Sequence, residues 1–227
     1  MQFPEISLFD DATAWTVPGT GGTLLVGAAT EEAVRLGLSA PYRGYFETGP
    51  MQWNDIDSGL RAAIRAGGLV LSLTTASAWK IDLTQLVTEA VIDRFGPVND
   101  ARRHEIELCL SESLTNALLH GNLEMDSAPR DSLSGLVRYL DQIEERLRDS
   151  RLAAKRIDLL ITPSSSGRLR VAVRDRGPGF DAEYYLDRPL VTEAKHGRGL
   201  PLIRQLAGSV AARDAGRTLV MSFSRAG

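Results

Sequence analysis

Apolar residues recur at helical spacing in three segments beyond residue 80. The first segment ends at Gly96-Pro97 and carries Leu83, Leu86, Val87, Ala90, Val91 and Phe95. The second runs from about Asp100 to His120, and the third carries Leu133, Leu136, Val137, Leu140, Ile143 and Leu147. Residues three and four positions apart share one face of an α-helix. We therefore expect three amphipathic helices, the first two packed side by side.

Three short segments are typical of β-strands. They cover residues 157–161, 168–174 and 218–224, and apolar and polar residues alternate in the last two. Because alternate side chains of a strand point to opposite faces, we expect one buried sheet face. Strands and helices together predict an α/β (α+β) fold. It is a two-layer sandwich of a mixed, largely antiparallel sheet with helices on one face.

The first 78 residues have a shorter and less regular pattern. We expect a helix with Thr30 as its N-cap residue and an apolar strand at residues 68–73. The chain is therefore divided into two parts. Residues 1–78 form a smaller α/β region of unknown role, which a degenerate regulatory module would fit, and residues 79–227 form a larger domain with a helical insertion at about 123–156.

A glycine-rich segment, GTGG at residues 19–22, lies in the first region. A dinucleotide-binding motif needs a third glycine where Leu24 stands, and it follows a strand, whereas this segment precedes one. A P-loop needs Lys followed by Ser or Thr, and two alanines stand at residues 28–29. We expect a turn that leads into a strand, not a phosphate site.

Composition and charge exclude several classes of function. The chain has 227 residues, 43% of them hydrophobic, and a net charge of −3 with no basic cluster, so we expect no direct binding of nucleic acid. The single cysteine, Cys109, forms no internal disulfide and indicates a reducing compartment. Without a long apolar segment or a signal-peptide pattern, we expect a cytoplasmic protein that does not bind membranes.

The second expected helix carries a row of polar residues at four-residue intervals. Glu112, Asn116 and His120 stand one helical turn apart and are followed by Gly121 and Asn122. On an α-helix these three side chains share one face. Glycine is common just beyond a helix C-terminus, so we expect the helix to end at Gly121. The row is either a solvated helix face or part of a site.

Two glycine-containing turns follow along the chain. Asp175 stands at the end of an expected strand, and Gly177 and Gly179 allow the backbone to turn sharply and approach a ligand. Gly197 and Gly199 then precede a helix with Pro201 in its first turn. The free N–H groups of a helix N-terminus attract anions, usually phosphate. Either turn alone is more simply a connection between elements.

In this order, the three segments resemble the N, G1 and G2 boxes of the GHKL ATPase superfamily, which has the Bergerat fold and includes gyrase, histidine kinases and MutL. The segments are SESLTNALLHGN (111–122), VRDRGPGFD (173–181) and HGRGLPLIRQLA (196–207). The resemblance covers about two thirds of the chain. Within the superfamily, the segments look most like the bacterial anti-sigma-factor serine kinases.

The resemblance implies ATP and Mg²⁺ as cofactors and gives the polar row its roles. Asn116 would be the metal ligand through its side-chain oxygen, since Mg²⁺ prefers oxygen ligands. Glu112 would be the catalytic base that accepts a proton from the attacking group. His120 would hold the lid over the nucleotide or a phosphate, unless it only satisfies the last carbonyls of its helix.

The resemblance also implies the remaining ATP-binding residues. Asp175 would accept the adenine amino proton, Gly177 and Gly179 would let the base lie close, and Thr218 would contact it through water. The residues of the phosphate side are Lys195, Gly197, Arg198, Gly199 and Leu200.

The function implied is that of an ATP-binding bacterial signalling regulator, an anti-sigma-factor-type serine/threonine protein kinase that uses Mg-ATP. The alternative is a non-catalytic, ATP-gated partner-binding module of a response-regulator or histidine-kinase-like system. The expected partner is a sigma factor, an anti-anti-sigma factor or a response regulator, and a homodimer is a further candidate. The helix at residues 132–149 would contact another chain or the N-terminal region, or else cover the domain's own flank.

Overall fold

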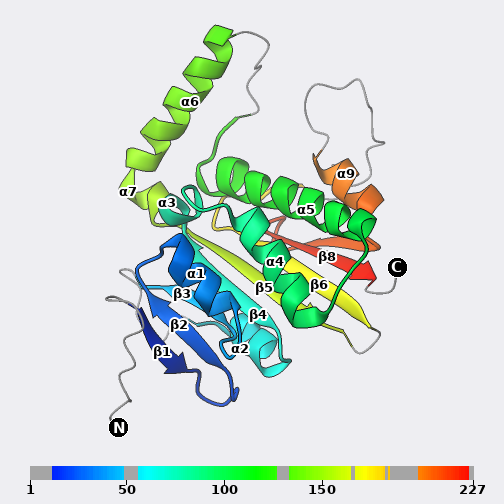
Figure 1. Ribbon diagram of the computed structural model, residues 1–227. Coiled ribbons are helices and arrows are strands. Elements are labelled where there is room, and N and C mark those ends of the chain that lie inside the picture. The colour runs from blue at the N-terminus through cyan, green and yellow to red at the C-terminus, as the bar shows by residue number, and fades with distance from the viewer. Residues whose placement is uncertain are drawn as a thin grey trace.

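A computed structural model describes residues 12–48, 56–126, 133–164, 167–181, 184 and 199–224. These residues form one eight-stranded sheet with the strand order β1-β2-β3-β4-β5-β6-β8-β7 (Figure 1). The strands are β1 (Ala12–Thr16), β2 (Thr23–Gly27), β3 (Gly44–Glu47), β4 (Leu69–Thr74), β5 (Arg156–Pro163), β6 (Arg168–Arg174), β7 (Ser209–Arg213) and β8 (Thr218–Ser224). Only the β2–β3 and β3–β4 pairs are parallel, so the prediction of a mixed, largely antiparallel sheet is confirmed.

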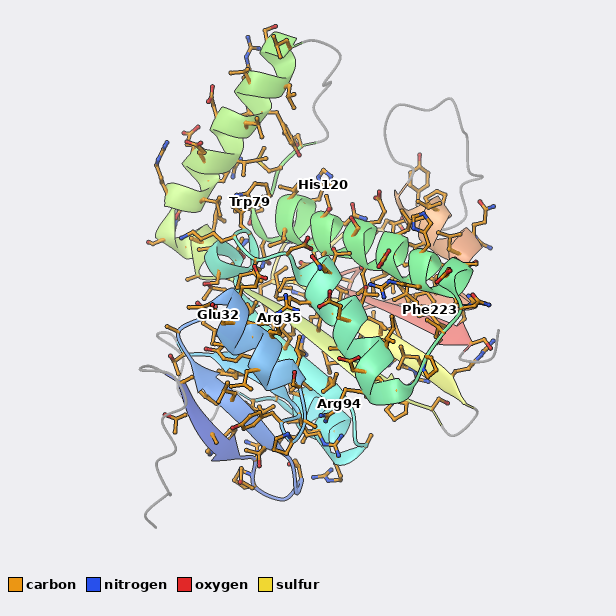
Figure 2. The ribbon with its side chains drawn as sticks, in the orientation of Figure 1. Glu32, Arg35, Trp79, Arg94, His120 and Phe223 are labelled. Atoms are coloured by element: carbon orange, nitrogen blue, oxygen red, sulfur yellow. The ribbon has the colours of Figure 1, made fainter. Side chains whose placement is uncertain are left out.

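Most of the helices lie on one face of this sheet (Figure 1). The helices are α1 (Glu31–Leu38), α2 (Ser58–Arg65), α3 (Thr75–Ala78), α4 (Leu83–Phe95), α5 (Asp100–Thr115), the π-helix η2 (Asn116–Asn122), α6 (Leu133–Arg148), α7 (Ser150–Ala153) and α9 (Gly199–Leu206). A continuous core joins α1, α4, α5 and α9 to the apolar side chains of the strands, among them Phe223 of β8, which Figure 2 labels. This core is the two-layer sandwich that the pattern predicts.

Helix α2 departs from the one-sided arrangement. Its residues Leu60, Ala63 and Ile64 pack with Leu24 and Val70 in a separate core on the other face of the sheet. The N-terminal half of the sheet is therefore covered on both faces. The C-terminal half carries its packed core on the face of α5 and α9.

The N-terminal strands extend the same sheet as the later strands. β4 pairs along its whole length with β5, so that Leu69 lies opposite Ile161 and Thr74 lies opposite Arg156. The sheet is thus continuous across residue 78. No observation here tests whether residues 1–78 and 79–227 are separate domains, and that division stays a prediction.

Local signals in the sequence correctly place several elements. Thr30 caps α1, because its hydroxyl accepts a hydrogen bond from the Ala33 N–H. The segment at residues 19–22 makes the turn between β1 and β2, as expected. Strand β7 was not predicted from the sequence, because it is a short strand at the edge of the sheet and most of its residues are small. Within the described residues, no helix is both long and apolar enough to cross a bilayer.

Helix α6 leaves the body of the molecule and projects away from the sheet (Figure 1). Tyr139 and Ile143 are buried in a small cluster with Leu119, Leu123, Met125 and Leu152. The other apolar side chains of its first turns are exposed; they are Leu133, Leu136, Val137 and Leu140. The expected apolar stripe is therefore divided between a packed part and an exposed part.

Candidate functional site

The polar row begins on α5 and continues into a π-helix. Glu112 lies in the last turn of α5, and Asn116 is the first residue of η2. Only the step from Glu112 to Asn116 therefore has the expected α-helical spacing. A π-helix is wider and turns less per residue than an α-helix, so the step from Asn116 to His120 lies in a different local geometry. This local widening is a frequent feature of functional sites in helices.

The start of α9 lies directly against this row. A Cβ atom on Gly199 would be 2.5 Å from Oε2 of Glu112 and 3.3 Å from Nδ2 of Asn116. A side chain at position 199 would therefore require the Glu112 carboxylate to move. The structure thus brings together three predicted site residues that come from two separate sequence motifs.

Gly121 does not end its helix, contrary to the expectation from sequence. The π-helix runs on to Asn122, and Gly121 lies within it. Its role is spatial: a Cβ atom at this position would lie 2.5 Å from Cγ of Asp175, and Gly177 packs against the Gly121 backbone. A glycine is needed here because the Asp175 turn approaches the helix backbone so closely.

Asp175 lies at the end of β6, on the face of the sheet that carries the helices. Its N–H continues the ladder to β8 by donating to the Arg217 carbonyl. Only 9% of its surface is exposed, and this burial raises the pKa of the Asp175 carboxyl. A hydrogen bond from the Gly177 N–H to Oδ1, 2.7 Å long, acts in the opposite direction by stabilising the carboxylate.

His120 binds the chain that leaves the helix. Its Nδ1 lies 2.7 Å from the carbonyl oxygen of Met125. Figure 2 shows His120 at the end of the helix that begins with α5. Two roles were predicted for His120, and this contact resembles the second, in which the side chain satisfies the last carbonyls of its helix. The carbonyl, however, belongs to the segment beyond the helix.

Thr218 is the predicted adenine contact that the structure does not bring to Asp175. In the β6–β8 ladder Thr218 lies opposite Arg174, and opposite residues of an antiparallel pair share a face. Asp175 belongs to the other face. The Thr218 hydroxyl instead donates to Oδ2 of Asp214, at 2.7 Å.

The remaining predicted residues divide into described and undescribed ones. Gly179 has a φ of +82°, which a glycine adopts without strain, and it packs against the Ala215 backbone. Leu200 packs against the main core at the start of α9. Lys195, Gly197 and Arg198 lie outside the described residues.

Sequence reasoning missed a buried polar network behind Asp175. Its neighbour Arg176 binds Asp158 with a 2.6 Å contact, and Arg174 binds the same carboxylate at 2.8 Å. Asp158 is almost wholly buried and also pairs with the Ser72 hydroxyl. The signal that was present is the charged residue within the apolar strand segment IDLLI. Buried charges are rare unless they are paired, so such a residue indicates a network.

Fold and site define the class of this protein. One face of a mixed sheet carries α5, the turn after Asp175 and the start of α9, and these elements contain the three motifs that resemble an ATP-binding site. A family model described as a histidine kinase-like ATPase domain matches residues 74–223. The chain therefore belongs to the histidine kinase-like ATPase domain family, within the GHKL-like superfamily. A search of curated protein sequences finds no match.

Proposed function

We propose that this ATPase-domain protein is a signalling regulator with serine/threonine protein kinase activity of the anti-sigma-factor type. The observation that carries this proposal is the meeting of Glu112 and Asn116 with Gly199 at the start of α9. Phosphoryl transfer needs a carboxylate, an amide oxygen that can ligate a metal, and a helix N-terminus beside them. They can accept a proton, bind a metal and hold phosphate.

The residues of the site fit Mg-ATP. Gly121 keeps a side chain away from the buried Asp175 carboxylate, and Gly177 lets the turn after Asp175 pack against the Gly121 backbone, which suits a planar base with an amino group. Asn116 would hold Mg²⁺, which neutralises phosphate charge when bound. Glu112 would accept the proton of the attacking hydroxyl, while the N–H groups of α9 would orient the phosphates.

A non-catalytic, ATP-gated binding module is the second candidate function. The exposed apolar residues of α6 favour it, because they offer a surface that a partner could cover. The partner in either case would be a sigma factor, an anti-anti-sigma factor, a response regulator or a second copy of the chain. A cytoplasmic location also remains a prediction.

Nucleotide binding and phosphoryl transfer are tested in two steps. Mg-ATP should raise the melting temperature of the purified protein, since a ligand that binds only the native state stabilises it. The protein is then incubated with labelled Mg-ATP and co-purified native partners, and Asn116→Ala is the control. A labelled partner band supports the kinase. A melting shift without label transfer supports the binding module, and no shift at millimolar nucleotide refutes both.

A further inference from the structure

Asn122, the last residue of η2, is wholly buried and bonded on two sides. Its Nδ2 donates to the Thr75 hydroxyl at 2.8 Å and to the Arg156 carbonyl at 3.1 Å. Its Oδ1 accepts from the Arg176 N–H at 2.6 Å. The amide orientation is unambiguous, because the Arg156 carbonyl can only accept and the Arg176 N–H can only donate.

These bonds join three parts of the fold that are distant in sequence. Thr75 begins α3, Arg156 begins β5, and Arg176 is the second residue of the turn that contains Asp175. The Arg176 guanidinium is held separately by Asp158. The peptide that follows Asp175 is therefore fixed from its backbone by Asn122 and from its side chain by Asp158.

Asn122 also stands next to the glycine on which Asp175 rests. The Asp175 carboxylate lies over Gly121, and the Gly177 backbone packs against the same glycine. A shift of the Arg176 peptide would move the Asp175 side chain over this surface. No other described side chain accepts a hydrogen bond from that N–H group.

We propose that Asn122 is a positioning residue that sets the place of the Asp175 carboxylate and, through it, the selectivity for the adenine amino group. This inference rests on the proposed function, in which Asp175 accepts a proton of that amino group. Asn122 does not touch the nucleotide. It acts by holding the Arg176 peptide against the end of η2.

The test compares ATP with purine riboside triphosphate, which lacks only the 6-amino group. Wild type should bind ATP at least about tenfold more tightly, as expected for a buried hydrogen bond to a charged group. Asn122→Ala should lose most of this ratio. In an Asp175→Asn background, where the ratio is already lost, Asn122→Ala should not change it further, because the two residues act through one contact.

Leu24→Ala is the matched control, since Leu24 is fully buried in the core on the other face of the sheet. It should lower stability and leave the ATP preference unchanged. If Asn122→Ala does not fold, Thr75→Val decides, because it removes one acceptor of the Asn122 amide at constant size. A wild-type ratio in whichever of these two variants is measured would overturn the proposal. A wild type that binds neither nucleotide would instead overturn the proposed function.

Discussion

The Asp175 carboxylate is held in surroundings that oppose its charge. Burial raises the pKa of this carboxyl, while the Gly177 N–H and nearby cations only partly compensate. A group whose pKa is higher in the folded state than in the unfolded state stabilises the fold at low pH. That stability is lost as the pH rises through the folded-state pKa. At neutral pH the empty site is therefore less stable than it would be with a neutral side chain.

We expect Asp175→Asn to raise the melting temperature of the nucleotide-free protein at pH 7 and to reduce the shift caused by Mg-ATP. Asparagine keeps the size of the side chain and an oxygen that can accept from Gly177, but it removes the buried charge. Thermal unfolding with and without nucleotide measures both effects.

The pH dependence provides the control for this prediction. The stability difference between variant and wild type should be smallest at low pH, where both side chains are neutral, and should grow as the pH rises through the raised pKa of Asp175. A variant that is less stable than wild type at pH 7 would contradict the account of Asp175.

A second prediction separates chemistry from binding. Glu112→Ala should reduce phosphoryl transfer by about 10²-fold or more if the carboxylate is a general base. The affinity for ATP should change little, because Asp175 and the start of α9 remain. Isothermal titration gives the affinity and label transfer gives the rate. Equal rates in wild type and variant would favour the ATP-gated binding module.

The residues of the site were only partly visible in the sequence. The approach of Glu112, Asn116 and Gly199 follows from motifs that the sequence shows. The role of Gly121 did not follow, because glycine near a helix end also signals termination, and only the fold brings Asp175 above it. The role of Asn122 could not be predicted either, because its hydrogen-bond partners belong to segments that are distant in sequence.

At the level of elements, α6 combines two kinds of surface. Tyr139 and Ile143 anchor the helix to the cluster around Leu123. Leu133, near the other end, is 80% exposed, and Leu136 and Leu140 are also exposed. An exposed apolar face on a projecting helix is typical of a binding surface. Substitution of Ile143 would therefore affect folding, whereas substitution of Leu136 or Leu140 would affect the exposed face.

We expect the double variant Leu136→Glu with Leu140→Glu to keep its fold and its nucleotide-dependent melting shift, because surface substitutions typically cost about 0.5 kcal/mol or less. It should lose dimerisation or partner binding, measured by sedimentation and by pull-down. Ile143→Ala is the contrasting control and should cost about 2 to 5 kcal/mol of stability through the cavity it leaves. Unchanged assembly in the double variant would show that α6 is no interface.

Helical spacing was the most informative pattern for the elements. It placed α4, α5 and α6 closely, because each carries apolar residues repeated at helical spacing. It did not show that α5 passes into a π-helix, since a change of hydrogen-bond register leaves no periodic signal in seven residues. The order of the strands was also hidden, because pairing depends on contacts between distant segments.

At the scale of the whole molecule, buried polar contacts bind the N-terminal strands to the ATPase domain. Arg156 of β5 donates to the carbonyls of Glu47 and Ser72, and its guanidinium stacks on the Phe46 ring at 4.2 Å. Glu47 in turn accepts hydrogen bonds from Thr74 and Ser77 at the start of α3. These contacts complete the network that reaches Asn122 through Thr75.

Composition and irregular pattern suggested two regions, but neither signal reports on strand pairing. The sheet crosses residue 78 through the β4–β5 ladder, and Asp158 pairs with Ser72 across the same junction. The family match also begins at residue 74, within β4. Folding of the later residues is therefore expected to depend on earlier ones.

A chain reduced to residues 79–227 should fail to unfold cooperatively and should show no melting shift with Mg-ATP. This fragment lacks β4, the strand that pairs with β5. Arg156 and Asp158 therefore lose their hydrogen-bond partners from β4. A buried polar group left without its hydrogen-bond partner costs about 1 to 3 kcal/mol, and more if it is charged, which is a large part of the total stability of a typical domain. Calorimetry of this fragment beside the full chain measures the effect.

A longer fragment, residues 68–227, is the matched control because it restores β4 and Ser72 while still lacking β1 to β3. It should recover part of the cooperative transition and some of the response to nucleotide. The two fragments thus distinguish a general need for the N-terminal region from a specific need for β4. If residues 79–227 alone unfold cooperatively and respond to Mg-ATP like the full chain, the ATPase domain is independent of the first 78 residues. The contacts across the junction would then join the N-terminal region to a domain that folds alone.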